Sequence, residues 1–224
     1  MKIIPNFMRK LMVSPKAYKW LNEMESPYVS DDCDKWVPYE WRHVEGTLAP
    51  CKNGLHFCTN AQGIIKWIPF GHNLSLWEAE YDRNDFVISY DNKVASRSGR
   101  ITKQLLSQED IREFLIDFIK DYKGQMEVFH PALGFYKSSD FDTSRIVRLI
   151  NSKSIINSNY LPFSSDDWPN GAERGIVMEI KMGYYNSAFD MIVDKKLLAK
   201  KLMEFIEKNN DESLKTVVDT NTKV

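Results

Sequence analysis

The segment Cys51-Lys-Asn-Gly-Leu-His-Phe-Cys-Thr-Asn60 organises this chain, because signals for a turn, a strand and a helix start follow one another in it without a gap. Asn53 and Gly54 predict a turn, since both residues tolerate positive φ. Alternating side chains then predict a short strand over residues 55–59, in which His56 and Cys58 share one face. Local geometry alone therefore brings cysteine and histidine side chains together.

The group formed by Cys51, His56 and Cys58 allows three interpretations. Thiolate and imidazole groups are ligands for zinc, and a cysteine beside a histidine base is a nucleophile. The cysteines lack the paired Cys-x2-4-Cys spacing, however, and no oxyanion-stabilising device accompanies them. We therefore expect no metal site, and we favour a buried cysteine pair with a histidine that hydrogen-bonds the backbone.

The composition is that of a globular protein, with 224 residues, 43% hydrophobic and 27% charged. A formal net charge of -1 gives no general attraction to nucleic acid or to an anionic membrane. The apolar runs are too short to cross a bilayer, and residues 1–9 lack the apolar region of a signal peptide. Three cysteines do not make a disulfide framework. We expect a cytoplasmic protein without a membrane or nucleic-acid partner.

Patterns around the central segment predict further elements of the N-terminal half. Residues 14–24 suit either a helix or a strand, while Asn60 caps a short helix over residues 61–67. Residues 76–81 and 86–90 alternate and predict a hairpin. Residues 93–101 then predict a basic edge strand. Its Lys93, Arg97 and Arg100, with Lys103 just beyond it, are placed to bind a phosphate or carboxylate unless they are simply solvated.

Aromatic side chains cluster shortly before the central segment, at Trp36, Tyr39 and Trp41. Tyr39, Trp41 and His43 would share one face of a strand. Such a cluster can stack on a flat ligand, but each ring also buries a large apolar area. We favour core packing for the aromatic rings and keep ligand binding as the alternative.

The clearest helix of the sequence covers residues 107–123. Ser107 and Asp110 have the spacing of a capping box, and the apolar residues that follow recur at helical spacing. Further on, residues 143–151 predict a helix, residues 176–182 and 189–193 predict two strands, and Asp194 caps a last helix.

These elements predict an α+β protein with a twisted, mainly antiparallel sheet, packed amphipathic helices and a smaller C-terminal β-β-α unit. We divide the chain into an α+β domain over residues 1–124 and a C-terminal α+β unit over residues 125–210. The alternative is that both belong to the same domain. Residues 211–224 are expected to form a flexible tail.

Residues 18–101 resemble a small uncharacterised domain found in phage and bacterial proteins. The resemblance rests on an ordered set of motifs: Tyr18-Lys19-Trp20, Trp41, Cys51-x2-Gly54-x-His56-x-Cys58, Trp77-Glu78-Ala79-Glu80 and Lys93-x2-Ser96-Arg97. It covers under half of the chain and implies a phage or bacterial source without implying an activity. The Cys/His and aromatic positions of such a domain can be structural.

A second segment resembles part of the ADP-ribosyltransferase-like folds. Gly54-Leu-His-Phe-Cys-Thr-Asn60, followed by a short helix and a strand, is similar to their segment of a strand, a threonine and a short helix. The resemblance implies an NAD-using enzyme. Its catalytic residues would be His56 and Glu179, with Glu80 as an alternative carboxylate, and its ligand pocket would be lined by Trp41, His43 and Thr59.

Two functions follow for testing. We favour a macromolecule-binding or host-modulating module without catalysis, with a protein partner, because no convergent acid/base set is visible. The alternative is the NAD-using transferase. The sequence assigns no cofactor to the favoured function and leaves the oligomeric state open.

Overall fold

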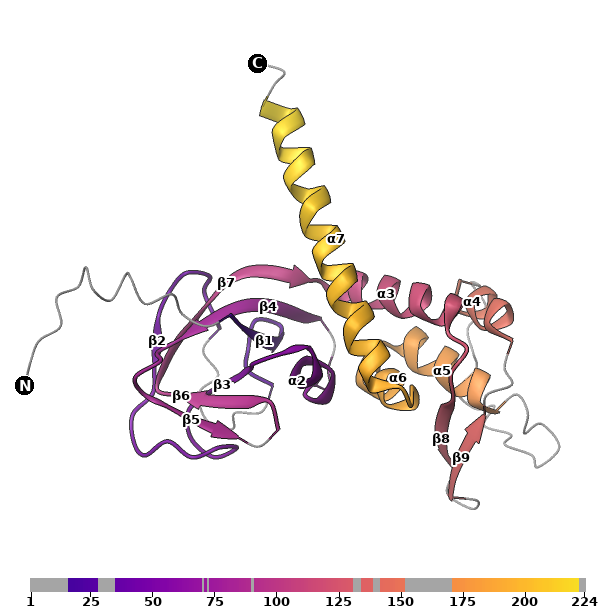
Figure 1. Ribbon diagram of the computed structural model, residues 1–224, viewed down its shortest axis with the longest axis horizontal. Coiled ribbons are helices and arrows are strands. Elements are labelled where there is room, and N and C mark those ends of the chain that lie inside the picture. The colour runs from indigo at the N-terminus through magenta and orange to yellow at the C-terminus, as the bar shows by residue number, and fades with distance from the viewer. Residues whose placement is uncertain are drawn as a thin grey trace, which may run out of the picture.

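A computed structural model of the protein describes residues 16–27, 35–69, 71, 73–89, 91–130, 134–138, 142–151 and 171–221. Its N-terminal half is a sheet with one short helix, and its C-terminal half is mainly helical (Figure 1). The elements of the first half are β1 (Ala17–Asn22), β2 (Arg42–His43), β3 (Leu55–Cys58), α2 (Ala61–Lys66), β4 (Leu74–Tyr81), β5 (Phe86–Ser89), β6 (Lys93–Ser96) and β7 (Ser98–Leu106). Those of the second half are α3 (Gln108–Asp121), β8 (Met126–His130), β9 (Gly134–Ser138), α4 (Thr143–Asn151), α5 (Gly171–Met182), α6 (Tyr185–Met191) and α7 (Lys195–Asn221).

The seven-stranded sheet has the order β2-β7-β4-β1-β3-β6-β5, and every neighbouring pair is antiparallel. β1 therefore lies in the middle, which settles the choice between helix and strand for the segment after residue 14. It pairs with β4 along its whole length but with β3 only at Tyr18 and Cys58. Beyond that single pair β1 and β3 diverge, and this divergence creates the space described below.

The hairpin expected between residues 76–81 and 86–90 is wrong. β4 has β1 on one side and β7 on the other, so no edge of β4 is open to β5. β5 pairs instead with β6, as the last strand of the sheet, and its Ile88 is 70% exposed. β6 is consequently an interior strand between β3 and β5, and Lys93 is buried in it rather than placed on a basic edge.

Apolar side chains form two clusters. One joins one face of the sheet to the helices and includes Trp20, Leu76, Phe114, Ile180 and Leu202. The other lies on the opposite face of the sheet and is centred on aromatic side chains; its large members include Trp36, Phe57, Trp77 and Tyr81. Because the first cluster contains residues from both sides of position 124, the sheet and the C-terminal helices share one core.

Several local predictions are confirmed. Asn60 caps α2 by accepting from the Gly63 N–H, and Ser107 forms a capping box with Asp110 at the start of α3. α3 buries the apolar stripe that its sequence predicts, and α4 has the expected range. With its antiparallel sheet and packed helices, the protein is α+β as predicted.

The two strands expected over residues 176–182 and 189–193 are helical instead. The buried residues of α5 include Ile176 and Ile180, which are one helical turn apart, although the same residues also fit a strand alternation. Packing of α5 against α4 and β8 favours the helix. The strands of the C-terminal half are β8 and β9, which form a separate hairpin.

The chain end also differs in its backbone from the expected tail, since α7 continues through Asn221. α7 packs against α2 and α3, and its far end extends away from the rest of the molecule (Figure 1). None of the helices in the described ranges combines the length and the apolar character that a membrane span requires.

Candidate functional site

A cavity of about 1130 Å³ lies where β1 and β3 diverge. Tyr18, Lys19 and Trp20 of β1 line it, together with all of β3, and with β2 and its flanking residues. The described lining also includes residues 51–54, Ser26, Pro27, Trp67 after α2, and Lys93 of β6. The central Cys/His segment of the sequence therefore borders a cavity that is large enough for a nucleotide-sized ligand.

Lys19 is buried in the cavity wall, with 5% of its surface exposed. It alternates with Ala17 and Leu21 on β1 and so points toward the aromatic cluster. Its ammonium lies 4.7 Å from the centroid of the Trp36 ring and 5.4 Å from that of Phe57, and it donates a hydrogen bond of 3.1 Å to the backbone oxygen of His56. That carbonyl belongs to the stretch of β3 that β1 does not pair with.

Lys93 is the second buried lysine of the cavity, 8% exposed. Its ammonium lies 3.5 Å from the centroid of the Trp67 ring and donates to Cys51 Sγ at 3.1 Å. Among the described residues, no carboxylate lies within salt-bridge distance of Lys19 or Lys93. Both cations are thus held by aromatic faces and neutral acceptors.

Burial shifts the pKa of Lys19, His56 and Cys58 toward the uncharged form of each side chain. Burial lowers the pKa of Lys19 to about 7, and the positive charges of Arg42 and Lys93 lower it as well. Burial also raises the pKa of the Cys58 thiol to about 12, so this thiol is protonated at neutral pH and supplies no negative charge to Lys19. At pH 7 a substantial part of Lys19 is therefore an uncharged amine.

His56 is neutral at physiological pH. Burial lowers its pKa to about 4, with further contributions from Lys93 and Lys19. Its Nε2 accepts a hydrogen bond of 2.9 Å from the backbone N–H of Cys51, which places the ring proton on Nδ1. Cys51 has a φ of 61°, so this hydrogen bond holds a residue in the left-handed region.

The favoured interpretation of the Cys/His group is confirmed for the histidine, which hydrogen-bonds the backbone as expected. It is wrong for the cysteine pair. Cys58 is buried, but Cys51 is exposed on the turn before β3, and both thiols are free. The turn carries Cys51 outward because its positive φ reverses the chain there.

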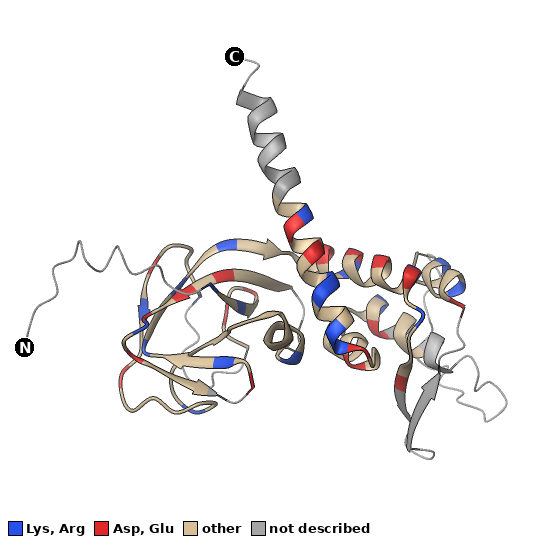
Figure 2. Cartoon of the chain, in the orientation of Figure 1, with Lys and Arg blue, Asp and Glu red and all other residues tan. Residues whose placement is uncertain are grey.

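The positive charge is local to the cavity. Its described lining contains four Lys and Arg side chains (Lys19, Arg42, Lys52, Lys93) and one carboxylate, Glu45, whose side chain is almost fully exposed. Over the other residues that the structure describes, acidic and basic side chains are interspersed (Figure 2). Among the described lining residues, cations therefore outnumber carboxylates, although the net charge of the chain is close to zero.

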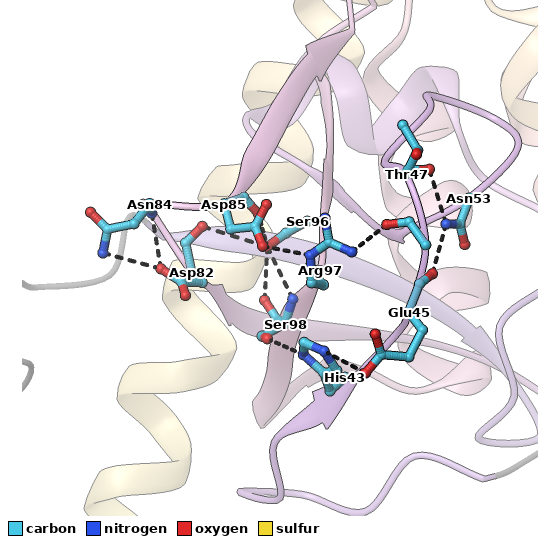
Figure 3. A network of polar contacts seen from close by, with 11 residues as sticks. His43, Glu45, Thr47, Asn53, Asp82, Asn84, Asp85, Ser96, Arg97 and Ser98 are labelled. Atoms are coloured by element: carbon cyan, nitrogen blue, oxygen red, sulfur yellow. Dashed lines mark hydrogen bonds and ion pairs between the residues drawn. The ribbon is translucent and has the colours of Figure 1, made fainter. Parts of the chain in front are cut away.

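A polar network fixes one wall of the cavity (Figure 3). Arg97 pairs with Asp85 at 2.6 Å and donates to the backbone oxygen of Gly46. Asn53 donates to the backbone oxygens of Glu45 and Thr47, at 2.9 Å and 3.0 Å. These contacts hold the loop between β2 and β3 in place, so Arg97, expected as a ligand-binding residue, is engaged in positioning the loop.

His43 belongs to the same network. Its Nδ1 shares a hydrogen bond of 2.8 Å with Ser98 Oγ, and its Nε2 lies 3.4 Å from Glu45 Oε1. His43 also lines the cavity, as does Trp41, which is 50% exposed and has the Arg100 guanidinium 5.1 Å from its ring centroid. The expectation of core packing holds for the buried Trp36, whereas Tyr39 and Trp41 lie at the surface beside β2.

The remaining expected site residues lie apart from the cavity lining that the structure describes. Thr59 donates from its hydroxyl to the backbone oxygen of Asn92 at 3.1 Å. Glu179 lies on α5. Burial raises the pKa of its carboxyl group, and a hydrogen bond with Ser187 partly offsets that rise. Glu80 is paired with Arg100 at 2.6 Å. The structure thus brings His56, His43 and Trp41 to one cavity and leaves both glutamates outside its described lining.

Sequence reasoning named Lys93 as a candidate anion-binding residue but missed its burial, and it missed Lys19 altogether. The signal at Lys19 was that Ala17 and Leu21, two residues before and after it, are both apolar. In a strand these three side chains share one face, so the lysine points toward the apolar side. No such signal existed for the burial of Lys93, because it depends on β6 lying between β3 and β5 in the sheet. Within the described ranges, no group of three or more His, Cys, Asp or Glu side chains is placed to hold a metal ion.

Comparison with known proteins gave a match to a family model over the part of the chain that contains the cavity. A family model described as a domain of unknown function (DUF7666) matches residues 16–113. The matched range contains all seven strands of the main sheet and the cavity residues Lys19, His56 and Lys93. Searches of curated proteins and of solved structures found no match.

Proposed function

We propose that the protein is a binding module without turnover, whose cavity holds an anionic group presented by a partner macromolecule. The observation that carries the proposal is the pair of buried lysines, Lys19 and Lys93, with no carboxylate in reach among the described residues. Burying an unpaired cation costs several kcal/mol of stability, and one strong interaction with an anion recovers an amount of the same order. A phosphate or carboxylate of a ligand would supply the missing countercharge.

The rim of the cavity favours a protein as the partner. Trp41 is half exposed there, and tryptophan and arginine are enriched where proteins bind one another. Tyr39, two residues earlier, is also exposed. A partner that inserts an acidic or phosphorylated side chain would cover these rings at the same time. Within the described ranges, the interspersed charges form no extended basic track for a nucleic-acid backbone.

The cellular setting remains part of the proposal. The free thiols Cys51 and Cys58 are compatible with a reducing compartment, such as the cytoplasm of a bacterium or of a phage-infected host. A host-modulating role rests on the resemblance of residues 18–101 to a domain of phage and bacterial proteins. The NAD-using alternative is not carried further, since Glu179 is not among the described residues that line the cavity with His56.

Isothermal titration calorimetry with inorganic pyrophosphate tests the anion site. We expect binding that weakens with added salt, and a loss of about tenfold in affinity in Lys93→Met, which corresponds to about 1.4 kcal/mol. Lys103→Met, at an exposed position of β7 outside the cavity lining, is the matched control and should bind like the wild type. Equal affinities in the two variants, or no heat with the wild type, would contradict the proposal.

A further inference from the structure

We propose that Lys19 is a covalent capture site, whose amine condenses with the carbonyl group of an anionic aldehyde or ketone to form an imine. This inference rests on the proposed function, because the same cations would hold the anionic end of the ligand. It adds a chemical class to that function: the anionic group presented to the cavity carries an aldehyde or ketone beside its phosphate or carboxylate, and a small oxo acid serves as the probe for it.

The geometry of Lys19 suits a nucleophile rather than a structural cation. Lys19 lines the cavity, and its Nζ has only one hydrogen-bond acceptor among the described residues, the backbone oxygen of His56 at 3.1 Å. A neutral amine that donates one N–H to this carbonyl keeps its lone pair available. The rings of Trp36 and Phe57 restrict its side chain, so the amine is held in one place on the wall.

The electrostatic surroundings keep a usable fraction of the amine uncharged. The charged or titratable groups near it are Arg42 of β2, His56 and Cys58 of β3, and Lys93 of β6. Arg42 and Lys93 lower the pKa of Lys19, whereas Cys58 raises it; because the Cys58 thiol is itself protonated at neutral pH, its stabilisation of the ammonium is small. With a pKa of about 7, roughly half of Lys19 is neutral at pH 7, against on the order of one in 10³ for an ordinary lysine.

The reaction needs no oxidant or cofactor. The Nζ lone pair forms a bond to the carbonyl carbon, and the π electrons of the C=O bond move to oxygen. A proton passes from nitrogen to that oxygen and gives a carbinolamine. The C–O bond then breaks, the second nitrogen proton is lost, and one water leaves, so amine plus carbonyl gives imine plus water.

The neighbouring cations select the ligand. Lys93 and Arg42 affect the pKa of Lys19 and line the same cavity, so a carboxylate or phosphate near the carbonyl would be attracted to them. The thiol of Cys58 does not compete for the carbonyl at neutral pH, because its pKa is raised to about 12 by burial.

The test uses glyoxylate as the anionic aldehyde and propionaldehyde as the neutral one. The full-length protein is incubated with each at pH 7 together with sodium cyanoborohydride, which traps imines, and the modified lysines are located by peptide mass mapping. We expect glyoxylate to label Lys19 at least about tenfold faster than any exposed lysine. Propionaldehyde should show less preference for Lys19, and pyrophosphate should compete with glyoxylate.

Variants separate the roles of the residues. Lys19→Arg keeps the charge and should lose the preferred label. Since a variant at this buried position can misfold, Lys93→Met provides a second readout: it keeps Lys19 but removes a positive neighbour, so the pH midpoint of labelling should rise. Lys103→Met should leave the rate and the midpoint unchanged.

Two results distinguish covalent capture by Lys19 from the proposed binding of an anion in the cavity. If pyrophosphate binds in the calorimeter but Lys19 is labelled no faster than exposed lysines, covalent capture is overturned and the anion site stands. If Lys19 is labelled selectively, but equally by both aldehydes and without competition by pyrophosphate, the imine stands and the anion site is overturned.

Discussion

At the scale of single residues, the position of Lys19 is costly for the fold. A buried ammonium in contact with aromatic rings and one carbonyl recovers only part of its lost hydration. Its lowered pKa is the direct expression of that cost, because the folded protein releases a proton that the unfolded chain keeps. A residue retained at such a cost is a candidate for function rather than for stability.

Lys19→Met should therefore stabilise the protein, by about 2 kcal/mol near pH 6. The wild-type pKa is about 7 when folded and near 10.4 when unfolded. The penalty is fully present below pH 7 and disappears as the pH rises toward 10. Urea unfolding at pH 6 and at pH 9.5 should show a gain that shrinks at the higher pH, while Lys103→Met shows none. If Lys19→Met were less stable than the wild type at both pH 6 and pH 9.5, the account would be contradicted.

His56 should make the fold sensitive to acid. Its folded pKa of about 4 lies below the ordinary value near 6.5, so the unfolded chain binds more protons between these values. Stability is complete above pH 6.5 and falls as the pH drops toward 4. In His56→Gln the part of this loss that depends on the imidazole should vanish, as measured by thermal unfolding across that range. An unchanged slope would show that other groups control acid unfolding.

At the scale of elements, α3 connects the sheet to the helical half. Its start is fixed by the capping box of Ser107 and Asp110, and its buried side carries Phe114 and Ile119 into the shared core. Ser107→Ala should cost about 1 kcal/mol of stability, since a helix-start N–H loses its partner. Chemical denaturation measures the change. Ser144→Ala, at an exposed position of α4, is the control and should stay within about 0.5 kcal/mol of the wild type.

Elements with strong local signals were predictable, and those fixed by distant partners were not. Asn60 and Ser107 mark the starts of α2 and α3 because capping is a local interaction. Residues 176–182 alternate like a strand and also fit a helix, so only their packing against α4 and β8 decides. The partner of β5 likewise depends on β1 and β7 occupying both sides of β4.

At the scale of the whole molecule, the α+β class followed from the order of the elements, but the strand order did not. β1 lies between β3 and β4, and both of these strands come more than thirty residues later in the sequence. The cavity is a consequence of that placement, because it opens where β1 and β3 diverge. His43, His56 and Trp41 were found from the sequence as residue types, whereas the charge of the cavity required the fold.

The central claim is that Lys19 and Lys93 together bind an anionic ligand, whose charge they balance. NMR titration of selectively labelled lysine side chains, with and without inorganic pyrophosphate, tests it most directly, with Lys103 as the internal reference. The account predicts that Lys19 titrates near pH 7 in the free protein and that pyrophosphate moves its midpoint upward. Titration of Lys19 near pH 10, or a midpoint that pyrophosphate leaves unchanged, would contradict it.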